Sequence, residues 1–374
     1  MWKKLAAVVL ILALSASLCG CGGLFDKEYV SVSDYVPAAG DDDEPDARIT
    51  VKTFSELKRA LVKLVSAGGT ESTVMFDPAY EGDTTEDMAS ACWQVRTRDA
   101  LCAYCVENIA YELTKIVTYY EANIRITYSE AGQSVGDIIQ MQYSAGLGEA
   151  IKNAYETGKT KLVVLISHSS YSAENVELYA GKVYEEYPAS STASPKVNVN
   201  MFSGTGMQRL YEINIDYGMS AAELDARRSE IERLDPFADE NTEDMDAADK
   251  ALLACEYLTA NCAYSDEAAL NNVYYALIGR QANSEGIALS YVELCRRLGV
   301  SCQIVYGQRD WQDYCWNIVG IDGQYYHVDV GRCITGGVES GFLLKDETMW
   351  VDHRWDVESY PHCTGALTYG EVAS

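Results

Sequence analysis

The residues best suited to chemistry in this chain are its 12 cysteines and four histidines. Cysteine can ligate zinc, form a disulfide or act as a nucleophile. One Cys-x-x-Cys pair occurs, Cys102 and Cys105, but no second pair follows at zinc-ribbon spacing, so we expect no metal site. Cys102/Cys105 and Cys255/Cys262 have helix-compatible spacings. Both disulfides and ordinary buried thiols remain open for them.

Two further cysteines follow a segment typical of exported proteins. Two lysines precede an apolar stretch, 5–18, which is too short to span a membrane and fits a signal peptide. The next residues, Leu18-Cys19-Gly20-Cys21, resemble a bacterial lipobox. The resemblance implies that Cys21 is lipidated and becomes the mature N-terminus. Residues 1–21 are then the signal peptide and lipobox, and the protein is lipid-anchored at the cell surface; an ordinary cleaved secretory signal is the alternative.

The charge of the chain excludes several partners. Its formal net charge is −27, from 29 basic and 56 acidic side chains, and this field repels nucleic acid and anionic lipid head groups. We therefore expect no nucleic-acid partner, and membrane contact through the lipid anchor only. Residues 22–48, with Asp41-Asp42-Asp43-Glu44-Pro45 at their centre, form no core and are interpreted as a disordered acidic tether.

Residues 49–217 contain two segments that look like copies of one small α/β unit. Each starts with a strand, continues with an amphipathic helix that ends at glycine, and closes on a similar strand, NIRITYS in one and EINIDYG in the other. In the first unit, Thr53-x-x-Glu56 predicts a capping box at the helix start. No catalytic signature falls in this region, and its one histidine, His168, is interpreted as a surface residue.

The remaining residues, 218–374, predict a helical lead-in followed by a second kind of domain. A strongly amphipathic helix is expected from about Ser284 to Gly299. Strands follow at 302–306, 314–321 and 325–330, the last two joined by the hairpin turn Asp322-Gly323. Helices first and antiparallel strands afterwards predict an α+β fold.

At this point the sequence resembles the transglutaminase-like superfamily, which has a papain-type fold. The matching stretches are ALIGRQANSEGIALSYVELCRRLGVSCQIVYG, CWNIVGIDGQYYHVDV and the tail FLLKDETMW…HRWD…YPHC. The resemblance covers roughly 245–363 and implies a cysteine–histidine–aspartate triad for acyl transfer. The cysteine position is Ser284, the histidine position is Tyr314, and the aspartate position is Asp329. Gly331-Arg332-Cys333 stands where the family commonly has Thr-Trp-Asp.

Two of the three triad positions therefore carry residues that predict an inactive site. A serine hydroxyl needs a neighbouring base, and Tyr314, with a usual pKa of about 10, is a poor one. We interpret Ser284 as an N-cap, Tyr314 as a residue that fills the old cleft, and Asp329 as an acceptor of a hydrogen bond from Tyr314 or Ser284. Strand alternation also places His327 on the face of Asp329, where it could act as a base. His353 and His362 are interpreted as structural, and Cys315 as a core residue.

Three function classes remain. The first is a non-catalytic surface module without a cofactor, which binds a peptide, a cell-wall component or a surface protein. Its cleft would be lined by Trp316, Asn317 and His327, with tyrosines from 325–326. The second is an active acyl-transfer enzyme or peptidase that uses Ser284 as its nucleophile. The third is a structural scaffold in which Tyr314 fills the cleft.

Overall fold

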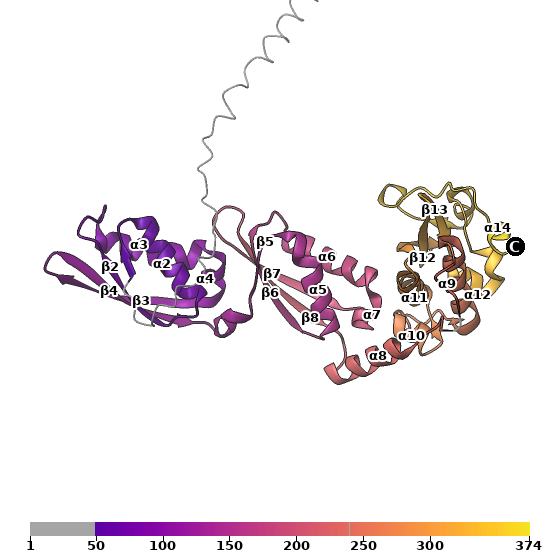
Figure 1. Ribbon diagram of the computed structural model, residues 1–374, viewed down its shortest axis with the longest axis horizontal. Coiled ribbons are helices and arrows are strands. Elements are labelled where there is room, and N and C mark those ends of the chain that lie inside the picture. The colour runs from indigo at the N-terminus through magenta and orange to yellow at the C-terminus, as the bar shows by residue number, and fades with distance from the viewer. Residues whose placement is uncertain (1–48, 239) are drawn as a thin grey trace, which may run out of the picture. The chain divides into compact units, whose positions relative to one another are not determined.

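The computed structural model describes residues 49–238 and 240–374. The expected signal peptide, the lipid site Cys21 and the acidic tether 22–48 lie outside the described residues. Figure 1 shows the helices and strands of the described chain. Within these residues, no helix is both long enough and apolar enough to cross a membrane.

The first α/β unit is a four-stranded sheet with strand order β1-β2-β4-β3, packed against three helices through one apolar core. Strands β1 and β2 are parallel, and the other neighbours are antiparallel. Thr53 starts the first helix and accepts a hydrogen bond from the Glu56 N–H, but Glu56 binds the Lys52 N–H, so only half of the predicted capping box forms. The elements are β1 (Ile49–Val51), α2 (Phe54–Ser66), β2 (Glu71–Phe76), α3 (Thr84–Arg98), α4 (Ala100–Cys105), β3 (Val106–Ile116) and β4 (Tyr119–Tyr128).

The second α/β unit has the corresponding strand order, β5-β6-β8-β7, with one parallel and two antiparallel pairs in the same sequence. Gly158, at a φ of 64°, follows the end of α5, a left-handed conformation that glycine adopts without strain. The two closing strands, β4 and β8, occupy the same place in their sheets. The elements are β5 (Ile139–Tyr143), α5 (Leu147–Glu156), β6 (Lys161–His168), α6 (Ala173–Glu186), α7 (Pro188–Ser191), β7 (Lys196–Ser203) and β8 (Arg209–Asp216).

The C-terminal domain is α+β, as the sequence predicts. After the helix α8 (Ala221–Arg233), helices pack on one antiparallel sheet of order β13-β12-β11-β14. Its main elements are α9 (Ala247–Asn261), β9 (Ala263–Tyr264), α10 (Val273–Leu277), β10 (Gln281–Ala282), α11 (Ser284–Leu298), β11 (Ser301–Arg309), β12 (Gln312–Ile321), β13 (Gln324–Val328), α12 (Val330–Gly336), α13 (Asp346–Met349), β14 (His353–Arg354) and α14 (Tyr369–Val372).

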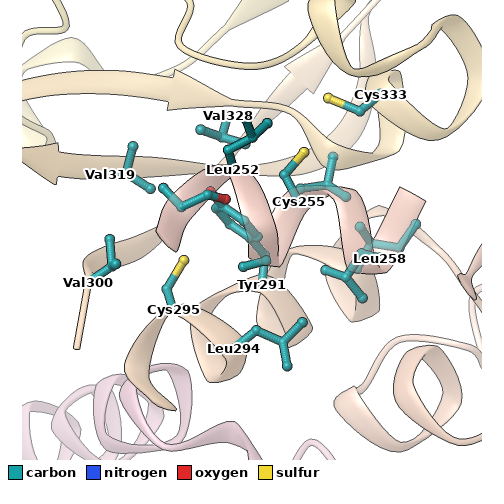
Figure 2. Packing of buried hydrophobic residues seen from close by; sticks show 14 of the residues in the cluster. Leu252, Cys255, Leu258, Tyr291, Leu294, Cys295, Val300, Val319, Val328 and Cys333 are labelled. Carbon is teal, nitrogen blue, oxygen red and sulfur yellow. The ribbon is translucent and has the colours of Figure 1, made fainter. Parts of the chain in front are cut away.

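Helix α11 is the central helix of this domain. Asn283 is its N-cap and accepts a hydrogen bond from the Gly286 N–H at 3.0 Å, while Gly299 ends it at a φ of 75°. Figure 2 shows Tyr291, Leu294 and Cys295 of α11 packed among apolar side chains of α9 and of strands β12 and β13. Tyr291 also donates a hydrogen bond to the Ala251 carbonyl at 2.9 Å. This packing fixes the position of α11, whose first residue is Ser284.

Candidate functional site

Ser284 is the first residue of α11 and is not its N-cap, so the N-cap interpretation is wrong. Asn283 fills that role, because its backbone is extended and its side chain reaches the Gly286 N–H. The Ser284 hydroxyl instead accepts a hydrogen bond from the backbone N–H of Cys315 at 3.2 Å. The half-buried serine thus connects the start of α11 to strand β12.

Tyr314, on β12, points at the aspartate position of the triad. Its hydroxyl donates a hydrogen bond to Oδ1 of Asp329 at 2.9 Å, and both side chains are buried. This is the hydrogen bond that the sequence suggested for Asp329. Burial raises the pKa of Tyr314 far above its usual range, and Asp329 raises it further against a smaller opposing effect of Arg309. Tyr314 therefore stays protonated and is unable to serve as a base at neutral pH.

Asp329 has a second role that is independent of catalysis. It is the N-cap of α12, and Oδ1 also accepts a hydrogen bond from the Arg332 N–H at 2.9 Å. Its Oδ2 lies 3.2 Å from Nε2 of His353 and 3.7 Å from Nη1 of Arg309. His353 is held on its other side by Asp352, whose Oδ1 lies 2.7 Å from Nδ1. The carboxylate is thus enclosed by groups that stabilise the fold.

All four histidines lie in the described residues, and none forms a hydrogen bond with Ser284. His353 contacts Asp329 and Asp352, His362 contacts Asp346, and His168 lies at the exposed end of β6. His327 is fully buried, and both ring nitrogens have partners other than Ser284: its Nδ1 accepts a hydrogen bond from Nε1 of Trp316 at 3.0 Å, and its Nε2 lies 2.9 Å from Oδ1 of Asp346. The hypothesis that His327 serves as a base for Ser284 is therefore wrong.

One cluster has the residue types of a metal site. Potential ligand atoms of His327, Asp346 and Cys363 lie within 4.8 Å of one another, and all three residues are buried. A metal on Nε2 of His327 would require the ring proton on Nδ1. The Trp316 N–H already donates to Nδ1, so the neutral ring carries its proton on Nε2 and donates to Asp346. The donor chemistry of this cluster fits a hydrogen-bond chain better than a metal.

The carboxylates near the start of α11 disfavour an ionised nucleophile. Burial raises the pKa of the Cys315 thiol above its usual range, and the carboxylates of Glu285 and Glu185 raise it further. Burial also raises the pKa of Glu285, although a hydrogen bond from Asn271 lowers it in part. Reactive cysteines and their serine equivalents occupy positive surroundings, where an anion is stabilised. Here the charged groups that act on Cys315, the hydrogen-bond partner of Ser284, are acidic.

The predicted cleft walls lie in the core. Trp316 is 1% exposed, Asn317 and His327 are fully buried, and Tyr326 is 3% exposed. Asn317 donates hydrogen bonds from Nδ2 to the carbonyls of Ala288 and Gln303, which connects β12 to α11 and β11. The prediction that these side chains line an open cleft is wrong. The C-terminal tail covers the face of the sheet that carries Trp316, where Met349, His353 and Cys363 are all fully buried, and Asn317 lies on the opposite face against α11.

Sequence reasoning missed two residues of this site. His353 and Arg309 both approach Asp329, yet neither lies in the stretches that carry the triad positions. His353 stands in the His353-Arg354-Trp355-Asp356 part of the tail, where the sequence predicts a structural residue but does not place it beside Asp329. Its pairing with β11 through β14 brings it to the site, and a two-residue strand leaves no detectable sequence pattern.

In the C-terminal domain, the start of α11 and strand β12 bring Ser284 beside Cys315, and Tyr314 contacts Asp329. Residues 236–330 match the family model of the transglutaminase-like superfamily, so this part of the chain is a transglutaminase-like domain. No curated protein matches the sequence.

Three solved structures are also similar. A structure described as a TGase shares 11% identity at a TM-score of 0.25 over 54% of this chain. A proposed cysteine protease from Cytophaga hutchinsonii shares 12% at a TM-score of 0.21 over 39%, and a proposed protease from Parabacteroides distasonis shares 9% at 0.21 over 70%. The chain spans 60%, 66% and 43% of the lengths of these three structures, respectively.

Proposed function

We propose that this protein is a surface lipoprotein whose transglutaminase-like domain no longer catalyses acyl transfer and serves as a binding module. The observation that carries the proposal is the hydrogen bond from Tyr314 to Asp329 at 2.9 Å. This hydrogen bond occupies Oδ1 of the triad aspartate, and a protonated phenol stands at the position of the base. Ser284 is left with a backbone N–H as its partner.

The energetic argument points the same way. Loss of either the nucleophile or its base in a serine protease lowers turnover by about 10⁶-fold. In this chain both positions are changed, and Glu285 and Glu185 disfavour an anion at Cys315, whose backbone N–H binds Ser284. The ligand class of the module is a peptide, a cell-wall component or another surface protein. Export and lipidation at Cys21 rest on the lipobox-like sequence.

The test is turnover by the full-length protein, kept in solution with a mild detergent. Glutamine-containing peptides and a primary amine are the substrates, and both ammonia release and peptide cleavage are followed. We expect no turnover above background for the wild type, for Ser284→Ala, or for Ser301→Ala, a matched control at an exposed serine of β11. Turnover that is lost in Ser284→Ala and kept in Ser301→Ala would establish a serine-dependent enzyme and refute the proposal.

A gain-of-function variant sharpens this test. Ser284→Cys combined with Tyr314→His restores the residue types of the family triad, with Asp329 already in place. If the scaffold is otherwise intact, the introduced thiol should react with an iodoacetamide probe faster in the double variant than in Ser284→Cys alone, because the histidine would favour the thiolate. Equal rates would mean that residues beyond 284 and 314 also block the chemistry.

A further inference from the structure

Trp311 lies at the tip of the β11–β12 hairpin with 78% of its surface exposed. Arg309 and Gln312 face each other in the ladder, so Asp310 and Trp311 form a two-residue turn. Their φ angles are 50° and 67°, both in the left-handed region. Two-residue hairpins of this kind favour Asn-Gly or Asp-Gly, because the second position is costly for a side chain.

The next hairpin provides an internal comparison. Between β12 and β13 the turn is Asp322-Gly323, with φ angles of 48° and 77°. In both turns the two central residues have left-handed φ angles, and Trp311 stands where the second turn has glycine. A bulky residue in the left-handed region is a conformational outlier, and such outliers are concentrated at functional sites. Packing does not account for Trp311, because most of the indole is exposed to solvent.

The tail places further apolar surface beside this turn. The Asp310 N–H donates to the Asp352 carbonyl at 2.9 Å, and β14 pairs with the end of β11. Next to these contacts, Trp350 is 50% exposed and Val351 is 81% exposed. The Arg354 guanidinium lies 5.5 Å from the centre of the Trp311 ring, and its Nη1 donates to the Trp350 carbonyl. Trp311, Trp350, Val351 and Arg354 form what is called here the Trp311 platform.

Arg354 has hydrogen-bonding capacity left over. Its Nη1 donates to the carbonyls of Trp350 and His353, whereas Nε and Nη2 have no partner among the residues that the structure describes. No carboxylate of the described chain forms an ion pair with it either. Exposed Asp310, in the turn itself, adds an acceptor at the rim. The platform therefore combines flat apolar faces with both donors and acceptors.

We propose that the Trp311 platform binds an uncharged sugar chain made of β-linked pyranose rings. Rings with equatorial substituents present a flat C–H face that packs on an indole, and their hydroxyls are donors and acceptors at once, as the rim requires. The net charge of −27 opposes a polyanion, and the positive charge of Arg354, which pairs with no carboxylate of the described chain, opposes a cationic peptide. A projecting turn also offers neither a pocket nor a strand edge for a peptide.

This proposal names one ligand class for the binding module proposed above, but it does not depend on the chemistry at Ser284. The test is isothermal titration of the full-length protein in mild detergent with cellohexaose and chitohexaose, and with α-linked maltohexaose as the contrast. We expect the β-linked oligomers to bind more tightly than maltohexaose. Trp311→Gly should weaken this binding at least tenfold, and Arg354→Gln severalfold.

Two measurements separate binding from folding. Trp311→Gly creates an Asp-Gly turn like that at 322–323, so its Tm should rise while its affinity falls. Trp93→Ala is the matched control: Trp93 is 52% exposed beneath Arg98, at 5.1 Å, but lies on helix α3 without strain, and its loss should leave the affinity unchanged.

Several outcomes would overturn the proposal: no heat with either β-linked oligomer, equal binding of maltohexaose, unchanged affinity in Trp311→Gly, or a lower Tm in that variant. Its failure is distinguishable from failure of the proposed function. The sugar-binding test depends on the Trp311→Gly variant and measures affinity. The test of the proposed function depends on Ser284→Ala and measures turnover.

Discussion

The hydroxyl of Tyr314 and the α-carbon of Gly331 occupy adjoining space, and a Cβ atom at residue 331 would overlap the Tyr314 oxygen. The resemblance to the transglutaminase-like superfamily places a threonine at 331 and a histidine at 314. A tyrosine is longer than a histidine, and the glycine provides the room for its hydroxyl. The two departures from the family pattern are therefore sterically complementary.

Gly331→Ala should destabilise the protein by about 2 kcal/mol, because it forces Tyr314 or the start of α12 to move. The matched control is Gly181→Ala, in helix α6, where an added Cβ meets nothing within 4 Å. That change should stabilise by roughly 0.5 kcal/mol, because alanine favours helix. Urea unfolding measures both. In a Tyr314→Phe background the cost of Gly331→Ala should shrink, and an unchanged cost would show that the hydroxyl is not the obstacle.

Asp329 should matter for stability rather than for turnover. Asp329→Ala removes the cap of α12 and leaves the buried Tyr314 hydroxyl without its acceptor, so we expect a loss of about 3 kcal/mol. Asp329→Asn keeps an acceptor oxygen and should lose roughly half as much. Chemical denaturation of both variants measures whether Asp329→Ala loses more stability than Asp329→Asn. Two variants as stable as the wild type would contradict the capping role.

His327 should make stability depend on pH. Burial lowers the pKa of His327 below its usual value, and Asp346 opposes this only in part. The folded protein therefore binds this proton less readily than the unfolded chain does. The contribution of His327 is complete above about pH 6.5 and is lost as the pH falls below it. We expect the unfolding free energy to decrease from pH 7 to 5, and the slope to flatten in His327→Gln but not in His168→Gln, the exposed control.

Glu212 should contribute a second dependence at lower pH. Burial would raise the pKa of Glu212, but hydrogen bonds from Lys161, Asn200 and Tyr104 outweigh it and lower the pKa to about 2. Its stabilising effect is therefore present above about pH 4.5 and is lost as the pH falls toward 2. Between pH 5 and 2.5, the Tm should fall less steeply with decreasing pH in Glu212→Gln than in the wild type. An identical pH profile in the variant would rule this source out.

Local signals predicted much of the C-terminal domain. Gly299 ends α11, Asp322-Gly323 forms the expected turn, and the Tyr314–Asp329 hydrogen bond is present. The cap of α11 was placed one residue too late, at Ser284, because serine and asparagine both cap well, and the sequence does not show which of two neighbours has the extended backbone. The cleft prediction failed for a different reason. Strand alternation assigns Trp316 and His327 to a face of the sheet, but only tertiary structure shows that the tail covers it.

Because Asp329 has a structural role, an aspartate at this position does not by itself distinguish active from inactive members of the superfamily. A change at Asp329 removes the cap of α12 and the hydrogen-bond partner of Tyr314, so it costs stability whether or not the site is catalytic. Selection for folding alone would therefore keep an acidic residue at position 329, whatever stands at positions 284 and 314. An aspartate at this position in a related chain is therefore evidence that the cap of α12 is present. By itself it is no evidence of catalytic activity.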